Sequence, residues 1–407
     1  MTQSEAIKIL QSGGNVFLTG SPGSGKTHTV STFIEWLREE GKVFAVTAST
    51  GIAATHINGV TIHSWAGLGI KDTIGERDVA KMNDFTKDRI RSADVLIVDE
   101  VSMLDANTID MIDFVMRNIR TEVFQPFGGL QVVFVGDFFQ LPPVSQTRQA
   151  KFAFQSNSWR DADLRTCYLT EQHRQSDPVF LGLLAAIRNG TVEEEHKEVL
   201  RERRKHEGDS ATKLFTHNAD VDRLNSDELG KLSGSPHTYR ATTGGIPFLV
   251  ERLTKSCLSP STLVLKEGAV VMFTRNKPDQ SYVNGTLGKV IGFTQGGFPQ
   301  VETKDGATII PQRETWKMEE NGQIKAQFTQ IPLRLAWAIT VHKSQGMSLD
   351  EASMDLSKTF EYGQGYVAIS RVRSLAGLYL KGMNKKMLEV HPEVVEQDKL
   401  FRLASGI

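Results

Sequence analysis

The 407-residue sequence predicts an α/β fold in which two domains each contain a parallel sheet, with a strand-rich insert in the second domain. Three observations support this class. The length suits two or three domains. Short apolar runs that end in small or polar residues alternate with helical stretches, as in parallel sheets that are buried on both faces. One later stretch instead alternates apolar and polar residues between glycine-containing turns, as antiparallel strands do.

The first half of the chain contains four apolar runs that we predict as strands of one sheet. They are NVFLTG (15–20), KVFAVTAST (42–50), DVLIVDE (94–100) and QVVFVGD (131–137). The stretch after the first run predicts a helix, because its apolar residues share one face at helical spacing: Val30, Phe33, Ile34 and Leu37, with Gly41 as the stop. Ligands of such sheets bind beyond the carboxyl ends of the strands, so the polar residues that end the runs should converge.

The second half repeats this pattern and contains the insert. Strands are predicted in KLFTHN (213–218), LRLAWAITVHKSQG (333–346), EASMDL (351–356) and GLYLKG (377–382), and a helix within EYGQGYVAISRV (361–372). Between the first two strands, residues 262–318 alternate in VLKEGAVVMFTRN, VNGTLGKVIGF, PQVETKDGATIIPQ and ETWKM. This alternation predicts a small antiparallel barrel inserted in the second α/β domain.

Composition limits the classes of function. The two cysteines, Cys167 and Cys257, argue against a disulfide scaffold or a zinc site and fit a reducing compartment. The start of the sequence does not resemble a secretory signal, and no apolar run approaches the roughly 18 residues that span a bilayer. We therefore expect a soluble intracellular protein, cytoplasmic or nucleoid-associated. The net charge of −1 gives no support for nucleic-acid binding by bulk charge, so any such site must be a local groove.

GSPGSGKT (20–27) has the spacing of a phosphate-binding loop. Its glycines permit a tight turn whose backbone N–H groups face phosphate oxygens, and the helix that follows adds its positive dipole end. Lys26 can reach the β and γ phosphates, and the hydroxyl of Thr27 can bind Mg²⁺. A chance match is the alternative, and the flanking strand and helix argue against it. The candidate nucleotide-binding residues here are Gly20, Ser21, Pro22, Gly23, Ser24, Gly25, Lys26, Thr27 and His28.

Polar residues at the ends of two further strands complete a candidate hydrolytic site. Asp99 and Glu100 end the third run, where Asp99 would hold Mg²⁺, largely through water, and Glu100 would orient the attacking water. Two acids that begin a helix are the alternative. Gln140, in VGDFFQLPPV, could bond the γ-phosphate or the water, although an ordinary turn glutamine is the simpler interpretation.

Two arginines lie beyond the first half of the chain. Arg174 is in LTEQHRQSD and Arg371 is in YVAISRVRS. Most arginines form ion pairs at the protein surface, and this is the alternative interpretation for both residues. The functional interpretation is that both reach across an interdomain cleft to the γ-phosphate, a task that suits the planar guanidinium and is worth about 10³–10⁵ in rate. ATP binding would then close the cleft and hydrolysis would open it.

The ordered motifs of the chain resemble the petite-integration-frequency (PIF) type of 5′→3′ DNA helicase, in superfamily 1B with the RecD-like and Dda-like enzymes. The resemblance covers nearly the whole chain, and TIHSWAG and ITVHKSQG are far more specific than the phosphate loop. The motifs that carry it are GSPGSGKT, TASTGIAA, TIHSWAG, LIVDEVSML, GDFFQLPPV, LTEQHRQSD, NGTLGKV, AITVHKSQGMSLD and YVAISRVRS.

The resemblance implies an ATP- and Mg²⁺-dependent 5′→3′ translocase that unwinds duplex DNA. Its partners would be single-stranded DNA and forked or tailed duplexes, with RNA–DNA hybrids and G-quadruplexes as further candidates, and it would translocate as a monomer. Two RecA-like domains would hold ATP between them. The implied domains are 1A (1–64 and 88–168), a wedge 1B (65–87), 2A (169–240 and 331–407) and an SH3-like insert 2B (241–330).

The resemblance also implies further site residues. Gln3 matches an upstream glutamine that reads the adenine edge, with a frayed terminus as the alternative. Gln345 and Gly346 would link the DNA site to the nucleotide. Trp65, Phe139 and Trp316 could stack on bases, although buried aromatics are commoner. The implied phosphate contacts of DNA are Thr50, Gly51, His63 and Ser64 in the first domain and Thr340, His342, Lys343 and Ser344 in the second.

Two other functions remain open from the residues alone. A P-loop phosphotransferase or regulatory switch would hydrolyse ATP without regard to DNA. A translocase subunit of a nuclease complex would be stimulated by DNA but would not separate strands. The sequence shows no carboxylate cluster of nuclease type, which argues against nuclease activity in this chain.

Overall fold

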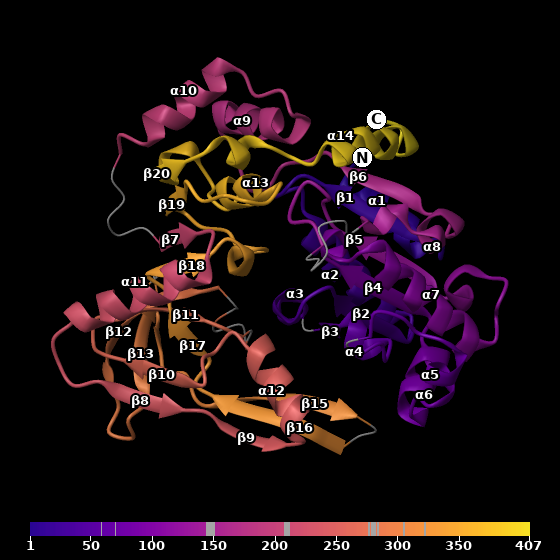
Figure 1. The fold of residues 1–407 in the computed structure, drawn as a ribbon, viewed down its shortest axis with the longest axis horizontal. Coiled ribbons are helices and arrows are strands. Elements are labelled where there is room, and N and C mark those ends of the chain that lie inside the picture. Colours follow the sequence, from indigo (N-terminus) through magenta and orange to yellow (C-terminus); the bar gives the residue numbers. More distant parts are fainter. Residues whose placement is uncertain are drawn as a thin grey trace.

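The computed structural model describes residues 1–407 except 58, 70, 144–150, 207–211, 276, 278–281, 283–284, 304–305 and 321–322. Figure 1 shows two α/β halves that face each other, with the strand-rich insert attached to the second half. The N- and C-termini lie side by side on the first half.

The first half is built on a six-stranded parallel sheet in the order β3-β2-β4-β5-β1-β6. Its four inner strands are the four predicted runs, whereas β3 and β6 were not predicted from their short, mixed sequences. The strands are β1 (Val16–Gly20), β2 (Phe44–Ala48), β3 (Val60–Thr61), β4 (Val95–Asp99), β5 (Gln131–Val135) and β6 (Arg165–Leu169).

Helices cover both faces of this sheet. α2 begins directly after the phosphate loop and buries the four apolar residues that predicted it. The helices are α1 (Gln3–Gln11), α2 (Lys26–Glu39), α3 (Gly51–His56), α4 (Ile62–Trp65), α5 (Glu76–Ala80), α6 (Asp84–Ser92), α7 (Ala106–Arg120) and α8 (Asn157–Asp161), with 3₁₀ turns η1 (Val101–Met103), η2 (Pro126–Gly129) and η3 (Ala153–Gln155).

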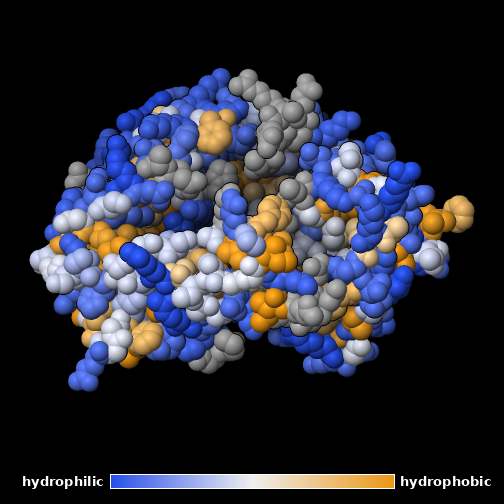
Figure 2. All heavy atoms as spheres, turned by 60° about the horizontal axis from the view of Figure 1, so that its bottom comes forward, coloured by the Kyte–Doolittle hydropathy of each residue, from blue (hydrophilic) through white to orange (hydrophobic). Residues whose placement is uncertain are grey.

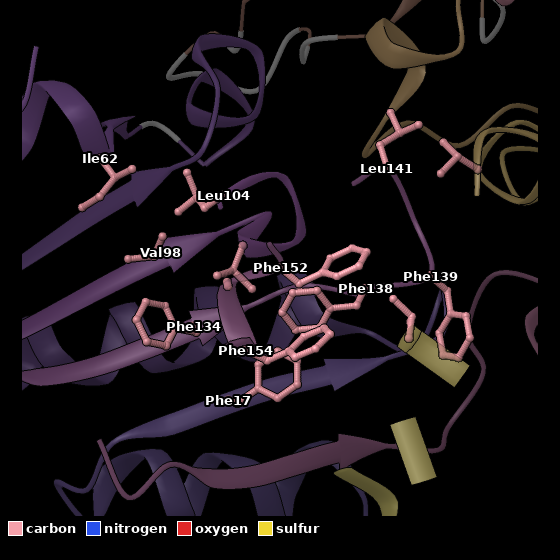
Figure 3. Packing of buried hydrophobic residues seen from close by; sticks show 14 of the residues in the cluster. Phe17, Ile62, Val98, Leu104, Phe134, Phe138, Phe139, Leu141, Phe152 and Phe154 are labelled. Carbon is pink, nitrogen blue, oxygen red and sulfur yellow. The ribbon is translucent and has the colours of Figure 1, made fainter. Parts of the chain in front are cut away.

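Strand β1 shows how the core is divided between the two faces. Successive side chains of a strand point to opposite faces, so Val16 and Leu18 join the cluster under α1 and α2, while Phe17 joins the larger cluster on the other side. There Phe17 packs against Phe138, with ring centroids 5.5 Å apart, in a group of aromatic rings that Figure 3 shows together with Phe152 and Phe154.

The second half has a parallel sheet in the order β18-β7-β19-β20, which confirms the second α/β domain. The predicted helix within 361–372 is α13. The elements are β7 (Thr212–Phe215), β18 (Ala338–Thr340), β19 (Ala352–Leu356), β20 (Leu378–Met383), α9 (Pro178–Asn189), α10 (Glu194–Arg203), α11 (Asn218–Lys231) and α13 (Gln364–Ile369), with 3₁₀ turns η4 (His342–Ser344), η5 (Leu375–Gly377) and η6 (Lys385–Leu388).

The insert contains a five-stranded antiparallel sheet in the order β14-β13-β12-β11-β17. The run 333–346 was predicted as one strand of the second α/β domain, and it is instead divided, because its first residues form β17 and pair with β11. The strands are β11 (Val270–Phe273), β12 (Leu287–Phe293), β13 (Pro299–Thr303), β14 (Thr308–Ile309) and β17 (Leu333–Leu335).

ETWKM does not belong to the five-stranded sheet, contrary to the prediction. It lies in β15 (Glu314–Glu320), which pairs along its length with β16 (Gln323–Gln330), and β16 pairs in turn with β9 (Thr242–Gly245). Phe328 of β16 is buried in a small core with α12 (Pro247–Ser256), and this packing gives β15 and β16 a sheet of their own. β8 (His237–Arg240) and β10 (Thr262–Leu265) form a further antiparallel pair.

The last helix, α14 (Pro392–Ala404), was assigned from sequence to the second domain but packs on the first sheet beside β6 (Figure 1). The reason is aromatic packing, since the ring of Phe401 lies 4.8 Å from that of Phe17. In addition, the hydroxyl of Tyr168 in β6 donates a hydrogen bond of 3.0 Å to Asp398. The chain therefore ends on the domain where it began.

The predicted wedge region, 65–87, contains α5 and is partly built into the first domain. Trp65, Leu68 and Val79 are buried in the larger core cluster. Its proposed function at a DNA junction is not decided by this packing and stays a prediction.

No helix in the described part of the chain has the length and apolar character needed to cross a membrane. The face in Figure 2 is mostly hydrophilic, with apolar side chains in small groups.

Candidate active site

The phosphate loop connects β1 to α2 and depends on glycine at its two ends. Gly20 has a φ of +148° and Gly25 a φ of +87°. A Cβ atom on Gly20 would lie 2.6 Å from Oγ of Ser24 and 2.7 Å from the carbonyl oxygen of Leu169. The left-handed backbone at Gly25 turns the chain directly into the first turn of α2. The loop therefore tolerates no side chain at Gly20 and disfavours one at Gly25.

Lys26 folds back over the loop that carries it. Its Nζ donates hydrogen bonds of 2.7 Å to the carbonyl oxygen of Gly20 and 3.1 Å to that of Ser21. Burial lowers the pKa of Lys26 to about 8, while the negative charges of Asp137 and Glu100 act in the opposite direction. A buried ammonium group whose hydrogen bonds go to neutral carbonyls would be stabilised by an anion bound in the loop.

Asp99 and Glu100 end β4 at the same edge of the sheet. Glu100 has a φ of +52°, the left-handed region that few residues other than glycine adopt, and such strain is concentrated at functional sites. Oδ1 of Asp99 accepts the backbone N–H of Glu100 at 2.8 Å. Burial and the charge of Asp99 raise the pKa of Glu100 to about 7, and burial also raises the pKa of Asp99, which Lys26 opposes.

The second domain reaches this edge through two predicted residues. Nε2 of Gln345 donates a hydrogen bond of 2.9 Å to Oε2 of Glu100. Arg371 is only 2% exposed, and its Nε donates to the carbonyl oxygen of Val367 at 2.9 Å. Burial lowers the pKa of Arg371 to about 9, with repulsion from Arg174 and attraction from Glu100 as further influences. A buried cation held largely by carbonyl oxygens is well placed to bind an anionic ligand.

Arg174 belongs to a short segment after β6 that wraps around the phosphate loop. The backbone N–H of His173 donates to the carbonyl oxygen of Gly23 at 2.9 Å, and the amide of Gln172 donates to Oγ of Ser21. Nη1 of Arg174 donates at 3.1 Å to the carbonyl oxygen of Ser370, next to Arg371. The segment thus contacts the loop on one side and the second domain on the other.

Gln140 lies in the turn after β5 and is 6% exposed. Its backbone N–H donates to the carbonyl oxygen of Asp137 at 2.9 Å, and its side-chain amide lies 3.5 Å from Oδ2 of the same residue. The structure therefore associates Gln140 with Asp137, whose charge acts on Lys26.

Arg188 is the functional candidate that the sequence analysis missed. Its Nη1 lies 2.8 Å from both carboxylate oxygens of Asp137, its Nη2 donates at 2.9 Å to Tyr168, and Nη1 also donates at 3.2 Å to Tyr366. Burial alone would lower the pKa of Arg188, but Asp137 raises it well above its usual range. The available signal was a charged residue within the apolar sequence of α9, where burial requires a partner.

Gln3 is the first residue of α1 and is not frayed. Thr2 caps the helix and forms a capping box with Glu5. The backbone N–H of Gln3 donates at 3.0 Å to Oε2 of Glu171. Its side-chain amide lies against Gly25, where an added Cβ would collide with Nε2 of Gln3.

The predicted magnesium ligands fit the chemistry of that ion. The Thr27 hydroxyl lies on the first turn of α2, and the carboxylate of Asp99 ends β4 within electrostatic range of Lys26. Mg²⁺ takes oxygen ligands and keeps several waters, so one hydroxyl and one carboxylate suffice beside phosphate oxygens. Among the residues that the structure describes, no group of three or more His, Cys, Asp or Glu residues could hold a metal by itself.

The predicted DNA contacts follow strand ends in both domains. In the first domain, Oγ1 of Thr50 accepts the N–H of Ala53 at 3.2 Å where α3 begins. Gly51, His63 and Ser64 are half-buried there.

In the second domain, Thr340 and Ser344 are buried, and Oγ of Ser344 donates to the carbonyl oxygen of Val341 at 2.8 Å. Oγ1 of Thr340 accepts the N–H of Lys343 at 3.3 Å, so both hydroxyls bond within the turn, whereas half-buried Lys343 lies nearer the surface. The side chain of His342 lies outside the described part of the structure.

Two of the three candidate stacking platforms are wrong for this structure. Trp65 and Phe139 are 7% and 2% exposed, and both belong to the core. Phe139 also packs under Arg188, whose Cζ lies 4.1 Å from the ring centroid. Trp316 is half-buried and packs edge-on against Phe328.

Comparison with known families places this geometry among DNA helicases. Residues 3–198 match the family described as PIF1-like helicase, and residues 249–293 match the family described as DNA helicase Pif1, 2B domain. The chain is 42% identical to the ATP-dependent DNA helicase Pif1 of a Psychrobacter species, over 99% of this chain and 71% of that protein. It spans 62% of the length of a relative of the same name from Emericella nidulans.

Solved structures of Pif1 helicases match the fold of this chain over nearly its whole length. The Pif1 helicase from Candida albicans matches with a TM-score of 0.86 and 34% identity, covering 98% of each chain. A Bacteroides Pif1 in complex with ADP-AlF4 matches with a TM-score of 0.82 and 32% identity over 98% of this chain and 96% of that one. Bacteroides Pif1 bound to single-stranded DNA matches with a TM-score of 0.73 and 31% identity, over 99% of this chain and 97% of that one.

Proposed function

Because the chain belongs to the PIF1-like helicase family, it is an ATP-dependent DNA helicase, and we propose that it translocates 5′→3′ on single-stranded DNA and unwinds the duplex ahead. The observation that best supports an ATP-driven motor is the meeting of both α/β halves at Glu100. Lys26 acts on this carboxyl from the first half, and Gln345 and Arg371 act on it from the second. A nucleotide bound beside Glu100 would touch both halves at once.

Each residue of the site has a proposed part in hydrolysis. Lys26, with the N–H groups of the loop, binds the β and γ phosphates, and Thr27 and Asp99 hold Mg²⁺, which neutralises phosphate charge when bound. Glu100, with a pKa raised to about 7, accepts a proton from the attacking water near neutral pH. Arg371 and Arg174 stabilise charge on the γ-phosphate, and Gln140 helps to orient the water.

Gln345 offers a route from hydrolysis to movement. It directly follows η4, which contains Lys343 and Ser344 of the predicted DNA contacts. Its side-chain amide donates a hydrogen bond to Glu100. Loss of the γ-phosphate would release Arg371 and Gln345 from the first half. The predicted DNA contacts of the first domain and those of the second would then move apart.

The proposed DNA path crosses both domains. Thr50, Gly51, His63 and Ser64 would contact phosphates in the first domain, and the η4 turn around Lys343 would do so in the second. Such contacts position a strand without reading its sequence and weaken as salt concentration rises. We retain the wedge at 65–87 and the four-part domain map as part of this proposal, with two changes: α14 packs on the first domain, and β17 belongs to the sheet of the insert.

The substrates that we propose are single-stranded DNA and forked or tailed duplexes. A structure of Bacteroides Pif1 bound to single-stranded DNA supports this class, as does a structure of DNA unwinding at forked double-stranded DNA by two coordinating Pif1 helicases. RNA–DNA hybrids, G-quadruplexes and action as a monomer are further proposals for the same assays.

Unwinding of duplexes that carry either a 5′ or a 3′ single-stranded tail tests the function. With ATP and Mg²⁺, only the 5′-tailed duplex should be separated. Displacement of the 3′-tailed duplex alone would overturn the polarity. ATPase activity that is indifferent to DNA would instead indicate a P-loop switch, and DNA-stimulated ATPase without strand displacement would indicate a translocase subunit.

A further inference from the structure

The side chain of Gln3 is held by a histidine from the segment that follows β6, the strand paired with β1. Nε2 of Gln3 lies 2.7 Å from Nε2 of His173, although the two residues are 170 positions apart. On the backbone side, Glu171 accepts the N–H of Gln3 at 3.0 Å. The segment after β6 therefore holds both the main chain and the side chain of this glutamine.

This contact couples the tautomer of His173 to the orientation of the Gln3 amide. When Nε2 of Gln3 donates, the imidazole Nε2 is the acceptor and the imidazole proton is carried by Nδ1. The Gln3 amide has two hydrogens on Nε2, one beside Oε1 and one pointing away from it. If the outward hydrogen is given to His173, the inner hydrogen and Oε1 remain together on the other edge of the amide.

That free edge has the pattern that pairs with adenine. A glutamine amide pairs with adenine through two bonds, with Nε2 donating to N7 and Oε1 accepting from the N6 amino group. Hypoxanthine, the base of ITP, carries an oxygen at the 6 position and cannot donate there. An amide that rotated by 180° would lose the adenine pattern and offer N–H groups to that oxygen instead.

We propose that His173 is a positioning residue for base recognition: it locks the Gln3 amide in the orientation that selects ATP over nucleotides with a 6-oxo base. This inference rests on the proposed ATP-dependent function of the same site. It adds a specificity determinant outside the phosphate loop, the strand-end acids and the two arginines.

The backbone of His173 is attached to the phosphate loop. Its N–H donates to the carbonyl oxygen of Gly23 at 2.9 Å, so the imidazole is anchored to the loop that would hold the phosphates. Gln3 in turn lies against Gly25 of the same loop. The residues proposed to select the base therefore contact the same loop that is proposed to bind the phosphates.

The test compares ATP with ITP in steady-state hydrolysis stimulated by single-stranded DNA. His173→Leu should lower the ratio of kcat/KM for ATP to kcat/KM for ITP about three- to tenfold, the effect of one hydrogen bond. The loss should appear mainly in KM for ATP, with kcat nearly unchanged, because the phosphate contacts are intact. His173→Gln, whose Oε1 can accept in place of the imidazole nitrogen, should restore most of the ratio.

Two controls separate this effect from general damage. His206→Leu removes an exposed histidine after α10 and should leave the ATP-to-ITP ratio unchanged. In a Gln3→Ala background, His173→Leu should have no further effect on the ratio, since His173 acts through Gln3.

The outcomes also separate this inference from the proposed function. If DNA stimulates the ATPase of the wild-type chain but His173→Leu keeps the full ATP preference, the role of His173 is wrong and the helicase function stands. Equal use of ATP and ITP by the wild type would likewise overturn the inference. An ATPase that DNA does not stimulate would count against the function itself.

Discussion

Gln345 and Glu100 are joined by a hydrogen bond of 2.9 Å between Nε2 and Oε2, across 245 positions of the sequence. Glu100 follows an inner strand of the first sheet, and Gln345 follows the η4 turn of the second domain. Lys26 and Arg371 act on the pKa of the same carboxyl from the two sides. Closure of the two halves around a nucleotide would therefore be sensed at this one group.

Replacing Lys26 by alanine is expected to lower ATP turnover by about 10²–10³, because the loop loses its cation at the phosphates. Binding of single-stranded DNA should persist, since the proposed DNA contacts lie elsewhere. ATPase assays and fluorescence anisotropy with labelled DNA measure the two properties. Lys42→Ala, at an exposed lysine after α2, is the matched control, and retained ATPase in Lys26→Ala would contradict the proposed site.

Arg371→Ala should cut DNA-stimulated hydrolysis by about 10³ while ATP binding is largely kept. The guanidinium would act on charge that develops at the γ-phosphate, and the phosphate loop would still hold the ground state. Stopped-flow hydrolysis and equilibrium binding of a fluorescent ATP analogue separate the two steps.

Arg373→Ala provides the comparison for Arg371. Arg373 lies two residues away and is paired with Asp350 at 3.1 Å, with both side chains about 60% exposed. Exposed pairs contribute little, so its hydrolysis rate should be close to that of the wild type. Equal rates in both variants would exclude Arg371 from the cleft.

Glu100 predicts a pH dependence of activity. Burial raises its pKa to about 7, and only the deprotonated form can accept a proton from water. The kcat/KM for ATP should therefore rise as pH increases through about 7, and Glu100→Gln should remove both this rise and most of the activity. A wild-type profile that is flat between pH 6 and 8 would contradict this assignment.

The raised pKa of Glu100 also predicts that the stability of the fold falls as pH rises, whereas the activity rises. Between its ordinary pKa of 4.5 and the folded value of about 7, the native state binds more protons than the unfolded state, so stability falls as pH rises. Glu100→Gln removes this penalty. It should be more stable than the wild type at pH 8, by about 1–3 kcal/mol, and the difference should shrink towards pH 5. Urea unfolding at both pH values measures this, with Glu40→Gln at an exposed acid as the control.

The repeating parts of the fold were predictable because they follow from local pattern. The continuous apolar runs ending at Gly20 and Asp99 predict buried parallel strands, and the polar residues after them predict a shared edge. Tertiary packing decided the rest. Phe401 places α14 on the first domain because it completes an aromatic cluster formed by residues far away in sequence. Likewise, β16 draws ETWKM into a separate sheet by pairing with it.

The site was predictable where a motif has a fixed local geometry, as at Lys26 and Glu100. The partner of Asp137 was not, because Arg188 reaches it from a helix that begins 41 residues later. The spacing of residues along the sequence does not indicate that Arg188 pairs with Asp137. Only the conflict between a charged residue and an apolar helix indicates it.

Arg188→Met should destabilise the protein by about 3–5 kcal/mol, because it leaves the carboxylate of Asp137 buried without its cation. Asp137 is fully buried, so water cannot replace the guanidinium. Methionine preserves much of the volume, and the loss therefore reports charge more than packing. Thermal or urea unfolding of the purified chain gives the magnitude.

A second variant distinguishes loss of the ion pair from loss of shape. In Asp137→Asn/Arg188→Met the orphaned charge is gone, so part of the stability should return, and the two single effects should not add. Arg201→Met, at an exposed arginine of α10 paired with Glu194, should leave the stability close to that of the wild type. If Arg188→Met matched that surface variant, the buried pair would contribute little to stability. If the double variant were as unstable as the sum of its parts, packing around Arg188, with Phe139 beneath it, would be the dominant cause.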